Sequence, residues 1–226
     1  MLDVPHRFYD KTISQQNNYL AFVCVALLVS VIGVAAISYF TGYIFFALCI
    51  PIIGLNYAPF IDLPIGKRKG RFKYYSPTLI SEWHPDGRLV LHGGTLFDYW
   101  YSIRHDWSPA EKKRKVLEWY LEGLLNLIDH FDHKEGSEDL QVLATTYFVN
   151  SKNIERSGFE LISTSVLQYF LIIANYFTIS MALTFINQRV TFFSFKSIYT
   201  FQVSFKELRS QKDEIEGLYL TLLNRK

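Results

Sequence analysis

The side chains best suited to hold a metal ion lie in a short polar stretch near the middle of the chain. Four of them are common ligands: His130, Asp132, His133 and Glu135. His130 and His133 are three positions apart and would share one face of a helix. Two imidazoles and a carboxylate suit zinc or iron. The chain has no HExxH or comparable motif, so we expect no bound metal and no cofactor. A membrane-tethered, metal-dependent enzyme that uses this set is kept as an alternative hypothesis.

Other catalytic chemistry has weaker support. Histidine and aspartate pairs that could transfer protons recur between residues 84 and 106. Turn formation and packing account for such residues without catalysis. The chain contains no GxSxG elbow, no GxxxxGK[ST] loop and no GxGxxG fingerprint. We therefore predict no catalytic residue and favour binding over chemistry.

A basic run directly follows the most apolar part of the chain. It consists of Lys67, Arg68, Lys69, Arg71 and Lys73. Such a run favours the cytoplasmic side of a membrane and attracts anionic lipid head groups. An anionic-lipid-binding module is therefore a second alternative. The formal net charge of +2 is too small to indicate a nucleic-acid partner.

The elements that must position these residues begin with a membrane anchor. Residues 12–61 contain no Asp, Glu, Lys or Arg. A spanning helix needs about 20 apolar residues, so this run accommodates two, over 19–40 and 43–61. A linker of two residues, Thr41 and Gly42, forces an antiparallel arrangement. We predict a transmembrane helical hairpin over residues 19–61, and a buried hairpin in a soluble protein is the alternative.

The orientation of the hairpin follows from its flanks. Arg7 and Lys11 precede it, the basic run follows it, and its turn is uncharged. Positive residues favour the cytoplasm. We therefore expect a cytoplasmic N-terminal segment over 1–18, an extracytoplasmic turn, and a cytoplasmic domain over 62–226. Both termini would then be cytoplasmic, and the expected location is a bacterial inner membrane.

The residue pattern after the hairpin predicts an α+β domain of antiparallel strands and helices. Residues 72–104 are rich in β-branched and aromatic types and carry two turn signals, at 85–87 and 93–94, which together predict a meander of strands. Ser108, Pro109 and Glu111 form a capping box that begins a helix. Further expectations are a strand over 140–149, a turn or the start of a short helix over 150–156, a strand or hairpin over 190–205, and an amphipathic helix over 206–223.

Residues 161–188 allow more than one interpretation. The segment is uncharged and long enough to span a membrane, but several polar side chains interrupt it. Polar amides are costly in hydrocarbon, and a third span would place the basic C-terminal residues outside. We favour a helix that is buried in the domain or rests on the membrane. The alternatives are a third membrane segment and a pair of strands.

The overall pattern favours an interaction protein. Hydrophobic residues make up 50% of the chain and aromatic residues 17%, which excludes intrinsic disorder. A tight hairpin with a compact domain is typical of accessory proteins that serve a larger membrane machine, in secretion, conjugative exclusion or immunity. This is an analogy of architecture. We expect a non-catalytic protein whose aromatic strands and segment 161–188 bind an integral membrane protein or a second copy of the chain.

Overall fold

The computed structural model describes residues 5–146, 160–195 and 198–224. The turn or short helix start predicted over 150–156 lies outside the described residues. The predicted strand over 140–149 is described only as far as residue 146, and that part is a strand.

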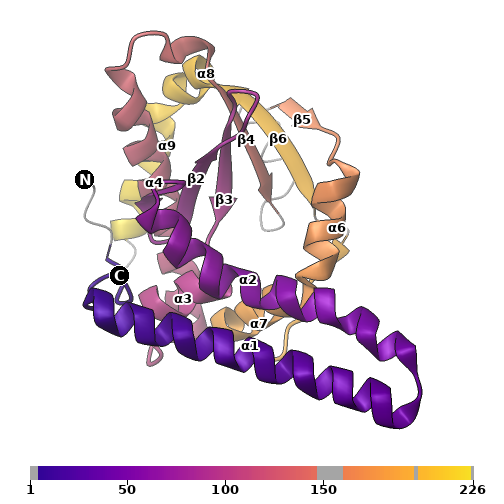
Figure 1. Cartoon of the computed structure of the whole chain (residues 1–226). Helices are drawn as coiled ribbons and strands as arrows, with labels where there is room; N and C mark the ends of the chain where they lie inside the picture. Colours follow the sequence, from indigo (N-terminus) through magenta and orange to yellow (C-terminus); the bar gives the residue numbers. More distant parts are fainter. Residues whose placement is uncertain (1–4, 147–159, 196–197, 225–226) are drawn as a thin grey trace.

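Two helices that are long and apolar enough to cross a membrane form the N-terminal hairpin (Figure 1). They are α1 (Ile13–Thr41) and α2 (Cys49–Arg68), joined by the short 3₁₀ helix η1 (Ile44–Leu48). Thr12 begins α1 through a capping box with Gln15, and Gly42 ends it with a φ of 71°. That left-handed φ favours glycine, so Gly42 permits the tight reversal. The predicted hairpin is confirmed, and both helices extend further toward the domain than predicted.

The strands of the described residues form one mixed, six-stranded sheet in the order β1-β2-β3-β4-β6-β5. They are β1 (Phe72–Ser76), β2 (Leu79–Trp83), β3 (Leu89–Gly93), β4 (Gln141–Thr146), β5 (Glu160–Ile162) and β6 (Tyr199–Ser204). The pair β3–β4 is parallel and the other neighbours are antiparallel. Together with the helices around it, this sheet confirms the α+β class.

The predicted meander is correct for its first three strands and wrong for its end. Gly87, with a φ of 85°, supplies the turn between β2 and β3, as the residue pattern indicates. Residues 96–102 instead form a helix, α3 (Leu96–Ser102). The reason is a capping box: the Asp98 carboxylate accepts hydrogen bonds from the backbone N–H and the hydroxyl of Thr95, at 2.7 and 2.8 Å. The cap outweighs the β propensity of the aromatic side chains.

Three helices cover one face of the sheet and enclose the main core. They are α4 (Pro109–Asp132), α8 (Phe205–Ser210) and α9 (Lys212–Asn224). Helix α4 begins at the predicted capping box. The predicted C-terminal helix is thus two helices, separated at Gln211. Core side chains with at most 1% of their surface exposed include Tyr75, Leu127, Ile128, Phe205 and Leu208. Each such burial contributes about 1.5–3 kcal/mol.

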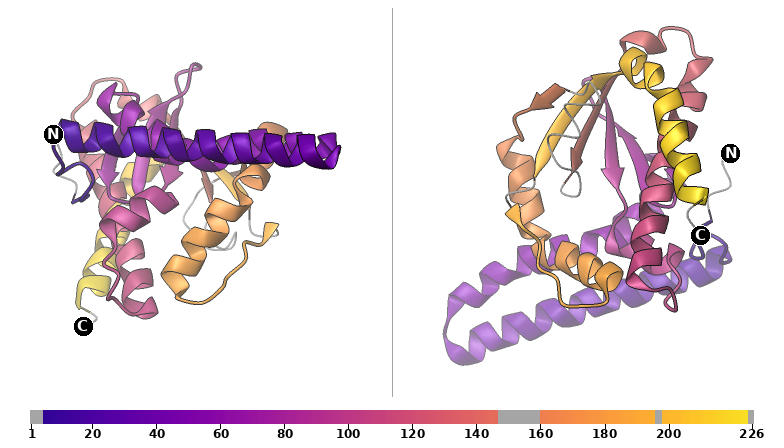
Figure 2. Two further views of the ribbon diagram at one scale, coloured as in Figure 1. Left: turned by 60° about the horizontal axis from the view of Figure 1, so that its bottom comes forward. Right: turned by 180° about the vertical axis from the view of Figure 1, so that it is seen from behind.

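Segment 161–188 forms two short helices rather than one. They are α6 (Val166–Ala174) and α7 (Tyr176–Asn187), and their axes differ by 61° at the break. The hairpin and α7 lie across one end of the strands, and α6 runs beside the sheet edge that β5 and β6 form (Figures 1 and 2). The break lies against the side of α2.

The N-terminal segment before α1 packs into the domain. His6 and Phe8 are completely buried, and Phe8 lies against Phe97 of α3. The Arg7 guanidinium donates to the backbone carbonyls of Trp100 and Ile103, at 2.7 and 2.8 Å. These carbonyls belong to the C-terminal end of α3, where acceptors lack partners within the helix and a positive charge is favoured. Arg7 therefore ties the start of the hairpin to the domain.

Candidate functional site

A cavity of about 480 Å³ lies between α2, the sheet face opposite α4 and the pair α6–α7. Small-molecule sites usually have volumes of about 300–1,000 Å³, so this cavity has the size of a binding site. Three separate parts of the chain form its walls, and none of them could enclose it alone.

The part of the cavity nearest the hairpin turn is mostly apolar. Leu55 and Ala58 of α2, Leu171 and Ile172 of α6 and Ile179 of α7 line it, together with the polar side chains of Gln168, Asn175 and Thr178. The α2 residues lie in a helix that is apolar enough to cross a membrane. This part of the cavity therefore accepts hydrocarbon.

The other end of the cavity carries ionisable side chains. Asp62, Glu82 and His92 line it. Arg71 forms an ion pair with Asp62, and its Nε lies 3.4 Å from Oε1 of Glu82. The His92 Nε2 lies 3.6 Å from Oε2 of Glu82. Contact with this imidazole, followed by the charge of Arg71, holds the pKa of Glu82 below its ordinary value despite partial burial. Glu82 is therefore ionised at neutral pH.

Asn56 holds the wall formed by α6 and α7 in place. Its Nδ2 donates to the Ala174 carbonyl at 3.1 Å, and its Oδ1 accepts from the Thr178 N–H at 3.2 Å. The Thr178 hydroxyl also donates to Oδ1. Backbone groups at a helix break have no partner within the helix. One side chain of α2 thus satisfies both sides of the break.

The structure does not bring the predicted metal ligands together. The His130 Nε2 lies 2.6 and 2.9 Å from the ammonium nitrogens of Lys73 and Lys134. Partial burial and these two charges lower the pKa of His130. Asp132 pairs with Arg209 at 2.5 Å, while His133 follows the end of α4 and Glu135 is exposed. Within residues 5–146, 160–195 and 198–224, no group of three or more His, Cys, Asp or Glu side chains could hold a metal ion.

Most of the predicted basic run makes contacts within the chain. The Lys67 ammonium lies 3.4 Å from the centre of the Tyr9 ring, and Arg68 donates to the side-chain oxygens of Gln16 and Asn17. Arg71 pairs with the carboxylates at the cavity, and Lys73 contacts His130. Lys69 is exposed just beyond the end of α2. The run therefore connects the hairpin to the domain as well as carrying charge.

A buried polar cluster fixes the N-terminal segment, and the sequence analysis missed its role. The side chains of His6 and Asp98 are fully buried, with Nε2 and Oδ1 3.4 Å apart. The Tyr74 hydroxyl donates to the same Asp98 oxygen at 2.9 Å. The cluster is closed to solvent and joins the N-terminal segment to β1 and α3. The TxxD spacing of Thr95 and Asp98 is a capping signal that could have located Asp98, but no local signal identifies His6 as its neighbour.

No protein family, no curated protein and no solved structure matches this chain.

Proposed function

We propose that this chain is an integral membrane accessory protein that binds a larger membrane protein and performs no chemistry itself. The exposed apolar face of α6–α7 is the observation that carries this proposal. Val166 exposes 88% of its surface, and Phe170 and Phe177 expose 59% and 65%. The fold holds this face outward through Asn56 instead of burying it. Exposed apolar patches of this kind mark surfaces that contact a protein partner or a membrane.

The hairpin and the sheet together support the proposed membrane placement. Strands β5 and β6 are hydrogen-bonded neighbours, so the segment between them begins and ends on one side of the membrane. Asn56 lies roughly 20 Å along the helices from Gly42, at a rise of about 1.5 Å per residue. A hydrocarbon core is about 30 Å thick, so Asn56 lies within it when the turn is at the far surface. The break between α6 and α7 then enters the bilayer and returns.

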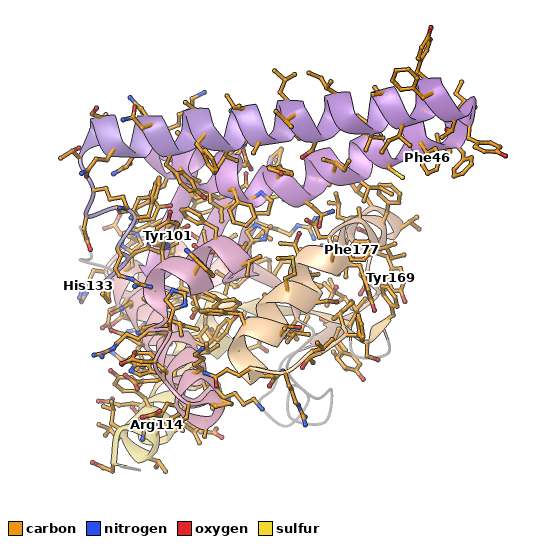
Figure 3. All side chains as sticks on the ribbon, turned by 90° about the horizontal axis from the view of Figure 1, so that it is seen from below. Phe46, Tyr101, Arg114, His133, Tyr169 and Phe177 are labelled. Carbon is orange, nitrogen blue, oxygen red and sulfur yellow. The ribbon has the colours of Figure 1, made fainter. Side chains whose placement is uncertain are left out.

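Backbone groups inside a bilayer must be satisfied by the protein. The hydrogen bonds of Asn56 to Ala174 and Thr178 meet that requirement. Figure 3 shows Tyr169 and Phe177 on the same side of the molecule as Phe46 near the hairpin turn, with His133 and Arg114 far from it. This arrangement supports an α6–α7 pair at the bilayer and a domain outside it. The basic run favours the cytoplasmic side of a bacterial inner membrane for that domain.

A protein partner accounts for apolar surface that lipid would not reach. Helix α9 packs on α4, to the left of the strands in the view of Figure 1. It exposes 48% of Leu220 and 43% of Leu223, which are three positions apart and share a face of the helix. The partner would therefore contact α6–α7 in the membrane and α9 in the cytoplasm. The metal-dependent enzyme has no comparable support, because the ligands expected for it are separated.

Photocrosslinking in living cells tests this proposal. A benzophenone side chain is placed at Phe170 or Phe177 in the full chain at native expression. The control carries it at Lys113, on the exposed, charged side of α4. We expect one membrane protein, or a second copy of this chain, to crosslink from 170 and 177 and not from 113. Crosslinks to lipid alone from both positions would contradict the proposal.

A further inference from the structure

We propose that the cavity between α2, the sheet and α6–α7 binds one membrane lipid that carries a primary ammonium head group. This inference rests on the membrane placement proposed above, but it does not require a protein partner. The shape of the cavity, the direction of its polarity and the sign of its charge support this inference.

The cavity changes from apolar to charged along the axis of α2. Leu55 and Ala58 line its apolar part, and Asp62 lines its charged end. From Leu55 to Asp62 the helix advances about 10 Å, at about 1.5 Å per residue. The apolar part lies toward the hairpin turn, and therefore toward the bilayer centre. An acyl chain from the bilayer can enter at that level while its head group remains near Asp62.

The charged end has an excess of acid. The Asp62 and Glu82 carboxylates both face the cavity, and Arg71 is the cation that pairs with them. Two carboxylates therefore face one guanidinium in this group. A phosphate without a balancing amine would meet repulsion here. A primary ammonium would donate charge-assisted hydrogen bonds to the carboxylates.

The requirement for N–H donors narrows the class of ligand further. A quaternary ammonium carries positive charge but cannot donate a hydrogen bond to Glu82. The site should therefore distinguish ethanolamine lipids from choline lipids as well as from anionic glycerol lipids. This selectivity is opposite to that expected of the basic run, which attracts anionic lipids.

Native mass spectrometry of the delipidated full chain in detergent tests the inference. The probes are phosphatidylethanolamine, phosphatidylcholine and phosphatidylglycerol with identical acyl chains. We expect one molecule of phosphatidylethanolamine per chain, bound about tenfold more tightly than either other lipid, as one charge-assisted hydrogen bond would give. Equal binding of the three lipids, or a preference for phosphatidylglycerol, would overturn the inference.

Two variants separate the head-group contact from the acyl-chain contact. Glu82→Gln should abolish the preference for phosphatidylethanolamine. Ala58→Phe should weaken the binding of all three lipids, because the larger side chain fills the apolar part of the cavity. Glu214→Gln, on the exposed side of α9, is the matched control and should bind as the wild type does. Circular dichroism confirms that each variant folds.

If Glu82→Gln keeps the preference for phosphatidylethanolamine, the carboxylate does not hold the head group and the inference fails. Crosslinking to a protein partner would be unaffected by that failure, so the two proposals are tested separately.

Discussion

Asn56 of α2 accepts a hydrogen bond from the backbone N–H of Thr178 at 3.2 Å, across 122 positions of the sequence. The contact joins the predicted membrane anchor to a segment that the residue pattern alone leaves ambiguous. It positions both the outward apolar face of α6–α7 and one wall of the cavity. The anchor and the domain are therefore one structural unit.

Removal of the Asn56 amide should loosen α6–α7 from the hairpin. Asn56→Leu leaves the Thr178 N–H and the Ala174 carbonyl without partners, and an unsatisfied group of this kind costs about 1–3 kcal/mol. We expect the free energy of unfolding in detergent to fall by at least that amount, because two such groups lose their partner. Asn224→Leu, on the exposed end of α9, is the control and should change it little. An unchanged unfolding curve for Asn56→Leu would show that the break is held by other contacts.

The contact between Arg7 and α3 should determine whether the N-terminal segment stays docked. Arg7→Ala leaves the carbonyls of Trp100 and Ile103 without their charged donor, and we expect a loss of about 1–3 kcal/mol in unfolding free energy. Trypsin should also cleave faster after Lys11. The control is Arg104→Ala, which removes an exposed arginine that pairs with Asp106. Its unfolding free energy should stay within about 0.5 kcal/mol of the wild type. Equal cleavage rates in both variants would contradict the docking role of Arg7.

Part of this fold can be predicted from local sequence signals. The uncharged run 12–61 identifies the hairpin because length and apolarity are local properties, and Ser108 with Glu111 identifies the start of α4. The same type of signal exists at Thr95 and Asp98, but the aromatic residues at 97 and 99–101 favour a strand. The break in 161–188 and the burial of His6 depend on distant partners, Asn56 and Asp98. No local pattern contains that information, so the cavity could not be predicted.

The lowered pKa of His130 predicts a pH dependence of stability. Burial and the charges of Lys73 and Lys134 lower the pKa in the folded state, so the unfolded chain binds a proton at higher pH than the folded chain does. The free energy of unfolding should therefore fall as the pH drops from about 6.5 toward the folded pKa. His130→Gln should make the free energy of unfolding fall less over this range. Urea unfolding between about pH 7 and pH 5, where histidine titrates, measures the difference. His105→Gln, at an exposed site, should retain the wild-type decrease, and a His130→Gln profile identical to the wild type would refute the assignment.

The same two lysines predict weak metal binding at His130. Their ammonium nitrogens lie 2.6 and 2.9 Å from Nε2, so a cation at this position would meet two positive charges. We expect added zinc to leave the melting temperature of the purified chain unchanged. Elemental analysis should find less than one zinc per chain. A stoichiometric zinc ion that is lost in His130→Ala would instead support the metal-dependent enzyme.

The most direct test of the central claim compares crosslinking from Phe177 in the wild type and in Asn56→Leu, in native membranes. The account predicts that the wild type gives one protein crosslink, to a membrane partner or a second copy. It also predicts that the crosslink weakens in Asn56→Leu, because the outward face of α6–α7 is no longer held in position. Equal amounts of the chain in both membranes, checked by immunoblot, make the comparison valid. A wild type that crosslinks to lipid alone, or a protein crosslink of equal yield in both, would contradict the claim.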